Sequence, residues 1–249
     1  MTMMIVLAPQ FDIITERTIA PRKERKRQDM METLTAADGH KLDCWFEPPV
    51  GARRGAIVIL QEIFGLTEQL KGVARKYAAL GYEVAIPALF DRVERGAVVD
   101  FNDFDRARAL MMASELPNTL TDIDAAARAM SAKGGRVGVI GFCWGGGLAL
   151  RSAQCLDIAA GVSFYGTRID QYLDKPLHTP FLAHFGLSDG HVPIEMIEDA
   201  KAALPGMEVH MYEAGHAFAN EARPSAYVEA AAEVAHARTA EFLALHIAA

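Results

Sequence analysis

Apolar residues follow two alternating patterns along most of this chain. Residues 56–60 form an unbroken apolar run, as in a strand that is buried on both faces of a parallel sheet. Residues 66–80 instead repeat apolar positions at helical spacing and end at Gly81, a residue type that often caps a helix. The same patterns predict further strands at 33–36, 41–46, 82–86, 136–140, 158–165, 180–185 and 207–212, and further helices at 102–115, 118–132, 148–154, 193–204 and 227–246.

Strands that alternate with helices indicate an α/β fold with a mainly parallel, doubly wound sheet. The first two strands, joined through Asp38-Gly39, predict a hairpin at one edge. The chain has 249 residues, which suffices for one such domain with a full core. We therefore expect a single α/β domain over residues 30–249.

Residues 1–29 differ from the rest of the chain. They carry six Lys/Arg against four Asp/Glu, with a basic cluster at 22–27 and no hydrophobic periodicity around it. Such a cluster can bind nucleic acid or acidic lipid. We favour the simpler explanation, a solvated tail or a start codon assigned upstream of the true one at Met30, over a binding role. We predict a poorly ordered N-terminal extension and assign it no function.

Composition narrows the classes of partner. The formal net charge of −7 argues against a nucleic-acid-binding protein. No apolar stretch approaches the ~20 residues of a membrane span, so no membrane partner is expected. The three cysteines, Cys44, Cys143 and Cys155, show neither metal-site spacing nor an even count, which favours free thiols in a reducing cytoplasm. The sequence predicts neither a metal nor an organic cofactor.

Candidate chemistry centres on the glycine-rich stretch 141–147. It follows a predicted strand, precedes a predicted helix and places Cys143 between Gly141 and Gly145, the setting of a nucleophile elbow. Glycines fit there because the sharp turn leaves no room for Cβ atoms. The N-terminus of the following helix favours a thiolate and a nearby oxyanion. The alternative is a glycine-rich turn that holds an inert buried cysteine.

A thiol nucleophile needs a base, and the base needs an orienting acid. In the α/β-hydrolase fold both follow the nucleophile, acid first and histidine second, each on a loop after a strand. Asp189 follows the strand at 180–185, and His216 follows the strand at 207–212. Their order and placement predict a triad with Cys143. His184, inside an apolar strand, indicates a core histidine, and His191 is a weaker alternative for the base.

The loop after the strand at 56–60 supplies an oxyanion-hole donor in this fold, and the residue after the nucleophile supplies the other. These would be the backbone N–H groups of Ile63 and Trp144. Glu62 lies on the same loop. It is either a surface acid that precedes a helix or a proton acceptor for the thiol.

Four motifs, at residues 61–65, 87–92, 141–146 and 214–218, together resemble the dienelactone hydrolase (carboxymethylenebutenolidase) family, in the same order along the chain. The resemblance implies Cys143 as nucleophile, Asp189 as acid and His216 as base. It also implies a thiol-activating carboxylate at Glu62 and an arginine at Arg92 that binds the substrate carboxylate.

One departure from the family pattern concerns that carboxylate. Dienelactone-cleaving members carry a serine right after the catalytic histidine and a second arginine four positions after it. Here those positions are Ala217 and Asn220, and Arg223 lies close enough in sequence to substitute. Loss of one charge-assisted contact of about 1.5–3 kcal/mol changes KM more than tenfold. The hydrolase chemistry is therefore better supported than the dienelactone substrate.

We interpret the sequence as a cysteine-nucleophile hydrolase that opens a lactone or cleaves a small carboxylic ester through a thioester acyl-enzyme. A broad-specificity esterase or thioesterase of the same fold remains open, as does a non-catalytic ligand-binding protein. A thiol-based redox protein would need a second cysteine near Cys143, and Cys155 is three helical turns away.

Overall fold

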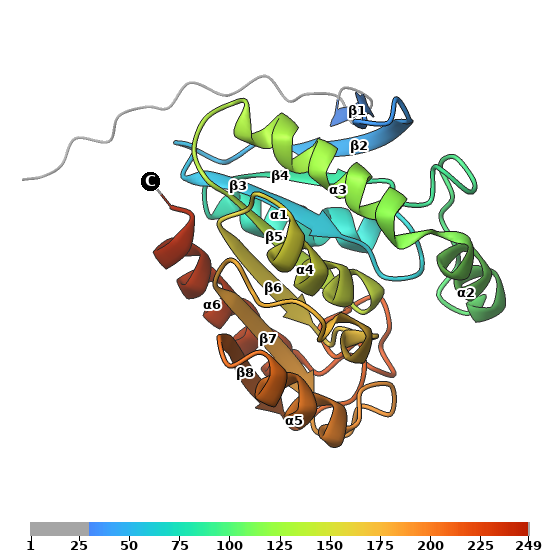
Figure 1. Cartoon of the computed structure of the whole chain (residues 1–249), viewed down its shortest axis with the longest axis vertical. Coiled ribbons are helices and arrows are strands. Elements are labelled where there is room, and N and C mark those ends of the chain that lie inside the picture. Colours follow the sequence, from blue (N-terminus) through green and yellow to red (C-terminus); the bar gives the residue numbers. More distant parts are fainter. Residues whose placement is uncertain (1–29, 249) are drawn as a thin grey trace, which may run out of the picture.

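The computed structural model describes residues 30–248 and contains one eight-stranded sheet with strand order β1-β2-β4-β3-β5-β6-β7-β8 (Figure 1). The strands are β1 (Met31–Thr35), β2 (Lys41–Glu47), β3 (Gly55–Leu60), β4 (Tyr82–Pro87), β5 (Val137–Phe142), β6 (Ala160–Phe164), β7 (Phe181–Gly186) and β8 (Met207–Tyr212). The hairpin β1–β2 pairs antiparallel, β2 pairs antiparallel with β4, and every other pair is parallel. The predicted mainly parallel sheet is confirmed.

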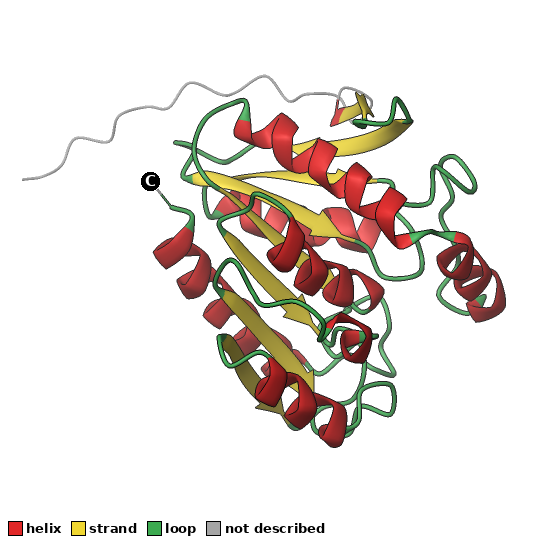
Figure 2. Ribbon diagram, viewed as in Figure 1, coloured by secondary structure: helices red, strands yellow, loops and turns green. Residues whose placement is uncertain are grey.

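Helices cover both faces of this sheet, as its continuous apolar strands require (Figure 2). They are α1 (Glu68–Ala79), α2 (Phe104–Ala113), α3 (Leu116–Ser131), α4 (Trp144–Cys155), α5 (Ile194–Ala203) and α6 (Glu229–His246), with a short 3-10 helix η2 (Ile169–Tyr172). Side chains of α1 and α6 pack on one face, and those of α3, α4 and α5 pack on the other. Every residue of β3, β5 and β7 is buried, which explains their unbroken apolar runs.

Two helix starts differ from the sequence prediction. Pro117, expected to separate two helices, lies in the first turn of α3, where its missing N–H is not needed. Helix α4 begins at Trp144, directly after Cys143, and not at Leu148, because three consecutive glycines (Gly145–Gly147) hide its helical pattern. Short η2 carries no periodic signal and was not predicted.

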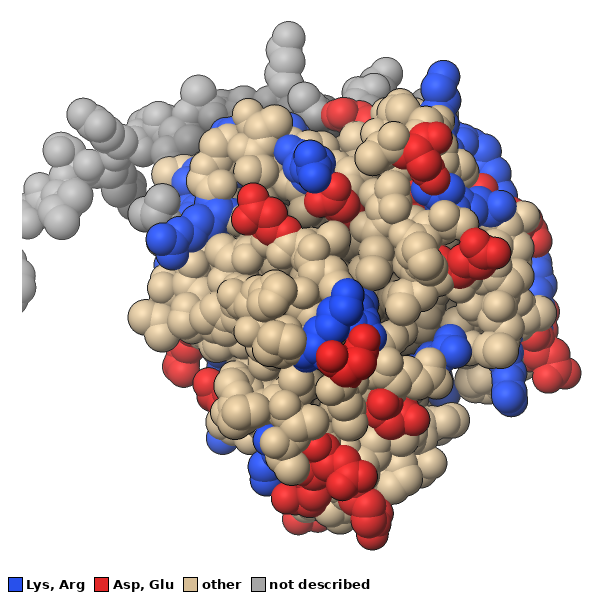
Figure 3. All heavy atoms as spheres, in the orientation of Figure 1, with Lys and Arg blue, Asp and Glu red and all other residues tan. Residues whose placement is uncertain are grey.

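Candidate functional residues gather where the parallel strands end. The carboxyl ends of β3, β5, β6, β7 and β8 meet at one edge of the sheet, and ligands of open α/β sheets bind at such edges. Helix α2 lies beside this edge (Figure 1). In the face drawn in Figure 3, basic and acidic side chains are interspersed. None of the described helices is long and apolar enough to cross a membrane, and the extension predicted at 1–29 lies outside the described residues.

Candidate active site

A strained turn carries Cys143 from β5 into α4. Its backbone has φ 52° and ψ −117°, a conformation that residues other than glycine rarely adopt. The neighbouring glycines are required: a Cβ on Gly141 would stand 1.8 Å from the carbonyl oxygen of Gly145, and one on Gly145 would stand 2.5 Å from that of Leu60. The structure therefore contains the elbow that the sequence predicts.

Asp189 and His216 meet beside this turn. Asp189 follows β7 and His216 follows β8, and the Nδ1 atom of His216 lies 2.8 Å from Oδ2 of Asp189. The Asp189 side chain is fully buried, and its other oxygen accepts a 2.8 Å bond from the backbone N–H of His191. The carboxylate thus holds the imidazole in one orientation, and leaves Nε2 free to face the sulfur of Cys143.

Opposing forces set the protonation of His216. Burial alone lowers its pKa, but the charge of the neighbouring Cys143 and the hydrogen bonds of the imidazole to Asp189 and Cys143 outweigh burial and raise that pKa to about 10. His216 is therefore an imidazolium at neutral pH.

Glu62 is buried close to Cys143 and His216. Its Oε1 accepts a 3.0 Å bond from the hydroxyl of Tyr165, and its Oε2 accepts a 2.8 Å bond from the amide of Asn220. Burial raises the pKa of Glu62, against the opposing charges of His216 and Arg223 and its two hydrogen bonds. Glu62 is therefore a buried carboxylate, and not a surface acid.

Tyr165 is a site residue that the sequence did not indicate. It directly follows β6, its ring contacts that of His216 edge-on with centroids 5.2 Å apart, and burial together with Glu62 raises its pKa well above the usual value. It also has φ 39°. Among the described non-glycine residues, only Cys143, Tyr165, Arg168 and Ala217 have positive φ, and all belong to the loops around this site. Backbone strain concentrates at functional sites.

The two expected oxyanion donors lie next to Cys143. Trp144 is the first residue of α4, so its N–H points out of a helix N-terminus. Within residues 30–248, neither this N–H nor that of Ile63 has a hydrogen-bond acceptor. The neighbouring N–H of Gly145 donates to the carbonyl of Gln61 at 3.1 Å, which joins the loop after β3 to the elbow. The expected donors are therefore unused in the folded chain.

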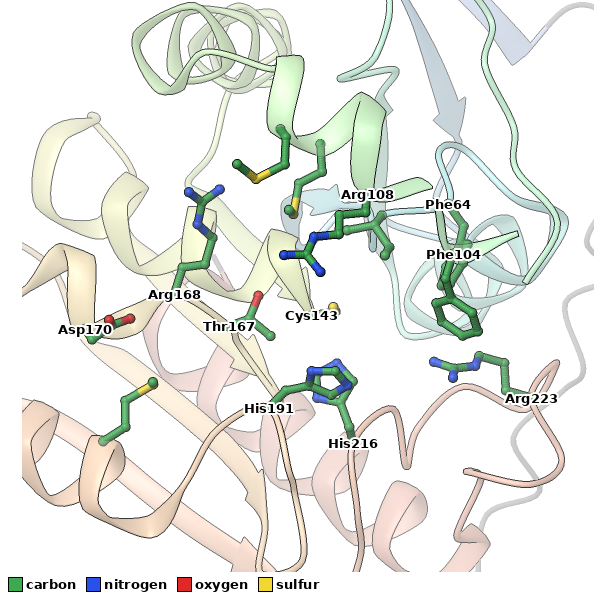
Figure 4. A pocket seen from close by; sticks show the side chains of 14 residues that line it. Phe64, Phe104, Arg108, Cys143, Thr167, Arg168, Asp170, His191, His216 and Arg223 are labelled. Carbon is green, nitrogen blue, oxygen red and sulfur yellow. The ribbon is translucent and has the colours of Figure 1, made fainter. Parts of the chain in front are cut away.

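A pocket of about 690 Å³ opens over Cys143 and His216 (Figure 4). Its apolar lining consists of Ile63, Phe64, Phe104, Met111, Met112 and Met196. Arg223 also lines it, with its guanidinium 5.4 Å from the ring centre of Phe104. The sequence signal for Arg223 is its position seven residues after His216, on the same loop.

Arg92 lies outside this pocket, unlike the placement expected from its motif. Its guanidinium binds both carboxylate oxygens of Asp122 on α3, at 2.8 and 2.7 Å, and pairs with Asp38 of the β1–β2 turn at 2.7 Å. The buried carboxylate of Asp122 requires such a partner. Asn220 is also turned away from the pocket, because it is fully buried and its amide binds Glu62.

The other cysteine and histidine candidates lie either inside or outside the pocket over Cys143. Cys44 is buried and Cys155 is exposed, and neither lines the pocket over Cys143. His184 is a core histidine, as predicted, whereas His191 lines the pocket with its ring centre 4.6 Å from that of His216. Among residues 30–248, no group of three or more His, Cys, Asp or Glu side chains could hold a metal ion.

A mostly parallel, doubly wound sheet with a strained elbow after β5 defines an α/β-hydrolase fold. Two solved structures share it. A putative dienelactone hydrolase from Klebsiella pneumoniae has a TM-score of 0.77 at 24% identity, covering 87% of this chain and 98% of that one. A Pyrococcus furiosus esterase has a TM-score of 0.65 at 18% identity, covering 91% and 99%.

The chain belongs to the dienelactone hydrolase family, whose model matches residues 42–247. A carboxymethylenebutenolidase from Pseudomonas putida is 33% identical over 224 residues, which cover 85% of this chain and 94% of the relative. A putative carboxymethylenebutenolidase from Escherichia coli K12 is 33% identical over 198 residues, covering 71% and 72%. The protein is accordingly a hydrolase that acts on ester or lactone bonds.

Proposed function

We propose that this hydrolase uses Cys143 as its nucleophile, His216 as its acid and base, and Asp189 to orient His216. The observation that carries the proposal is the 2.8 Å bond between His216 and the buried carboxylate of Asp189, beside a cysteine in the strained elbow conformation. A passive cysteine would not explain why the backbone is strained there. Nor would it explain a histidine whose pKa is raised to about 10 by Cys143 and Asp189 in spite of burial.

The first half-reaction forms a thioester. The Cys143 thiolate attacks the substrate carbonyl carbon, and the backbone N–H groups of Ile63 and Trp144 stabilise the resulting oxyanion. When the tetrahedral intermediate collapses, the C–O bond to the leaving alcohol breaks and the His216 imidazolium donates a proton to that oxygen. An ester releases its alcohol, whereas a lactone keeps the new hydroxyl on the acyl chain.

The second half-reaction frees the acid. Neutral His216 takes a proton from water, the hydroxide attacks the thioester carbon, and the C–S bond breaks to restore the thiolate beside an imidazolium. The same two backbone N–H groups stabilise the second oxyanion. Hydrolysis then ends with the charge pair with which it began.

Glu62 is proposed to take the thiol proton whenever Cys143 is protonated. Its burial supports this role, because a raised pKa gives a carboxylate more affinity for a proton. Tyr165 and Asn220 occupy both its oxygens in the described structure, so they position the carboxylate in its resting state.

The proposed substrate carries a carboxylate, for which Arg223 is the pocket-lining candidate. Arg92 would serve only after leaving Asp122 and Asp38. The pocket volume of about 690 Å³ and its methionine and phenylalanine lining favour a second candidate function, a broader esterase or thioesterase. Rates with dienelactones, aryl esters and thioesters, measured side by side, distinguish the two.

Because the thiol must stay reduced, we also infer a cytoplasmic location, which cell fractionation checks.

The test replaces the nucleophile. We expect Cys143→Ala to lose at least ~10³-fold in kcat/KM for 4-nitrophenyl acetate, and iodoacetamide to abolish wild-type turnover. Cys44→Ala and Cys155→Ala are matched controls and should retain near-wild-type activity. Glu62→Gln should slow alkylation of Cys143 by iodoacetamide. Equal losses in all three cysteine variants would mean structural damage and would contradict the assignment.

A further inference from the structure

Two more arginines line the pocket, and the function proposed above does not use them. Arg108 lies on α2 and Arg168 follows β6. In Figure 4 both lie above the level of Cys143, whereas His216 lies below it and Arg223 lies to the right of His216. Asp170 is the single acid among the described residues that line the pocket. The pocket is therefore cationic, although the whole chain is acidic.

Neither guanidinium is neutralised within the described part of the chain. No carboxylate of residues 30–248 lies within ion-pair distance of Arg108 or Arg168. By contrast Arg106, on the same helix as Arg108, pairs with Glu94 at 2.6 Å. The helix thus carries one arginine that is paired away from the pocket and one that is unpaired within it.

Arg168 has a strained backbone and a side chain that a hydrogen bond holds in place. Its backbone adopts a left-handed conformation with φ 61°, and its Nε donates to the side chain of Gln171 at 3.1 Å. That bond uses one of its five N–H donors and leaves the two terminal nitrogens available. A strained backbone that presents an unpaired guanidinium to a cavity indicates a binding group.

The position of Arg108 and Arg168 indicates that they contact the acyl part of the substrate. His216 must protonate the leaving alcohol, so the alcohol lies on the His216 side of Cys143. The acyl group then extends to the opposite side, toward Arg108 and Arg168 (Figure 4), in a pocket that Met111, Met112 and Met196 also line. Methionine side chains suit the methylene groups of an acyl chain.

We propose that Arg108 and Arg168 form an anion subsite for a carboxylate at the far end of the acyl chain. The preferred substrate would then be an ester of a dicarboxylic acid, with an apolar stem between its two carbonyl carbons. This inference rests on the function proposed above, because Cys143 and His216 define which side is the acyl side.

The test compares two esters that differ only at the chain end: the 4-nitrophenyl hemiester of adipic acid and 4-nitrophenyl hexanoate. We expect the wild type to prefer the anionic ester, and Arg108→Gln and Arg168→Gln each to lower its kcat/KM by about ten- to a hundredfold. The neutral ester should change less than about threefold, and so reports on folding in the same variants. Arg106→Gln, the matched control, should leave both rates unchanged.

A third ester tests the assignment to the acyl side. 4-Acetoxybenzoate carries its carboxylate on the leaving group, and its hydrolysis should be insensitive to Arg108→Gln and Arg168→Gln. If it slows as much as the adipate ester does, the arginines do not select the acyl group. Equal changes for the adipate and hexanoate esters, or no change for either, would overturn the subsite.

Binding separates this subsite from the proposed chemistry. Calorimetric titration of the Cys143→Ala variant with monomethyl adipate and with methyl hexanoate measures recognition without turnover. Tighter binding of the anionic ligand, lost on adding Arg108→Gln and Arg168→Gln, supports the subsite even if Cys143→Ala retains activity and the nucleophile assignment fails. Equal binding of both ligands would count against the subsite alone.

Discussion

Two histidines near the same sheet edge, the buried His184 and the partly buried His216, have opposite acid–base properties. His216 bonds to the carboxylate of Asp189 and faces Cys143, and its pKa is raised to about 10. His184, in β7, bonds to the hydroxyls of Tyr212 and Thr239 at 2.8 and 2.9 Å, and burial lowers its pKa well below the usual value. Burial pushes both histidines the same way, so the charge of the partner decides which one carries a proton.

The comparison explains why only one of them suits catalysis. A neutral histidine that is fixed between two hydroxyls joins β7 to α6 and has no charge to offer. A histidine beside a carboxylate can donate a proton and recover it during each turnover. His236 belongs to the first kind: its Nδ1 lies 2.8 Å from the hydroxyl of Tyr77, and burial lowers its pKa to about 3.

Removal of the Asp189 carboxylate should reduce the difference between His216 and His184 most strongly. Asp189→Asn deprives His216 of its carboxylate and favours the wrong tautomer, so turnover should fall by about 10²–10⁴-fold. Steady-state rates and a circular dichroism melt separate this loss from misfolding. Asp199→Asn, on an exposed position of α5, is the matched control and should retain full activity. A fully active Asp189→Asn variant would show that another group orients His216.

Acid should reveal the neutral histidines through stability. The pKa values of His184 and His236 are depressed in the folded state, so the unfolded chain binds more protons below about pH 6.5. Their contribution to stability is complete above that pH and decreases as pH falls. Between pH 7 and 5.5 we expect a loss of about 1 kcal/mol for each of them.

Urea unfolding at those two pH values measures this loss. His236→Gln should show a smaller difference between the two pH values than the wild type does, whatever its absolute stability. His178→Gln, at an exposed position, should keep the wild-type difference. An unchanged difference in His236→Gln would mean that other groups cause the acid sensitivity.

A smaller effect tests how much Cys143 contributes to the charge of His216. Its charge is the largest of the influences that raise the His216 pKa, so Cys143→Ala should lower that pKa while the bond to Asp189 remains. NMR titration of the imidazole resonances measures the change, and Cys44→Ala should leave the titration as in the wild type. No shift in Cys143→Ala would assign the raised pKa to Asp189 alone.

Strand-end positions could be predicted from sequence because they depend on local pattern. The runs at 180–185 and 207–212 identified two strands, and the residues that follow them, Asp189 and His216, meet as expected. The glycines at 141 and 145 identified the elbow for a similar reason, since close backbone contact excludes every other residue.

Side-chain partners from distant segments could not be predicted in this way. Arg92 has the sequence position of a pocket residue, but α3 brings the buried carboxylate of Asp122 to it, and that contact depends on how the helix packs. The bond between Asn220 and Glu62 likewise joins residues 158 positions apart. Tyr165 was counted as strand because its apolar ring continues the pattern of β6, and its hydroxyl contact with Glu62 leaves no trace in sequence.

The backbone at Cys143 has a consequence for how this chain evolves. Its φ of 52° lies in a region that glycine adopts without strain, whereas a residue with a Cβ there costs about 1–3 kcal/mol of stability. Exchange of Cys143 for glycine would relax the turn, so if Cys143 is the nucleophile that we propose, thermal stability and turnover favour different residues at this position. A lineage under selection for stability alone would drift away from cysteine here, and the proposed role of Cys143 as nucleophile would account for a cysteine at so unfavourable a backbone conformation.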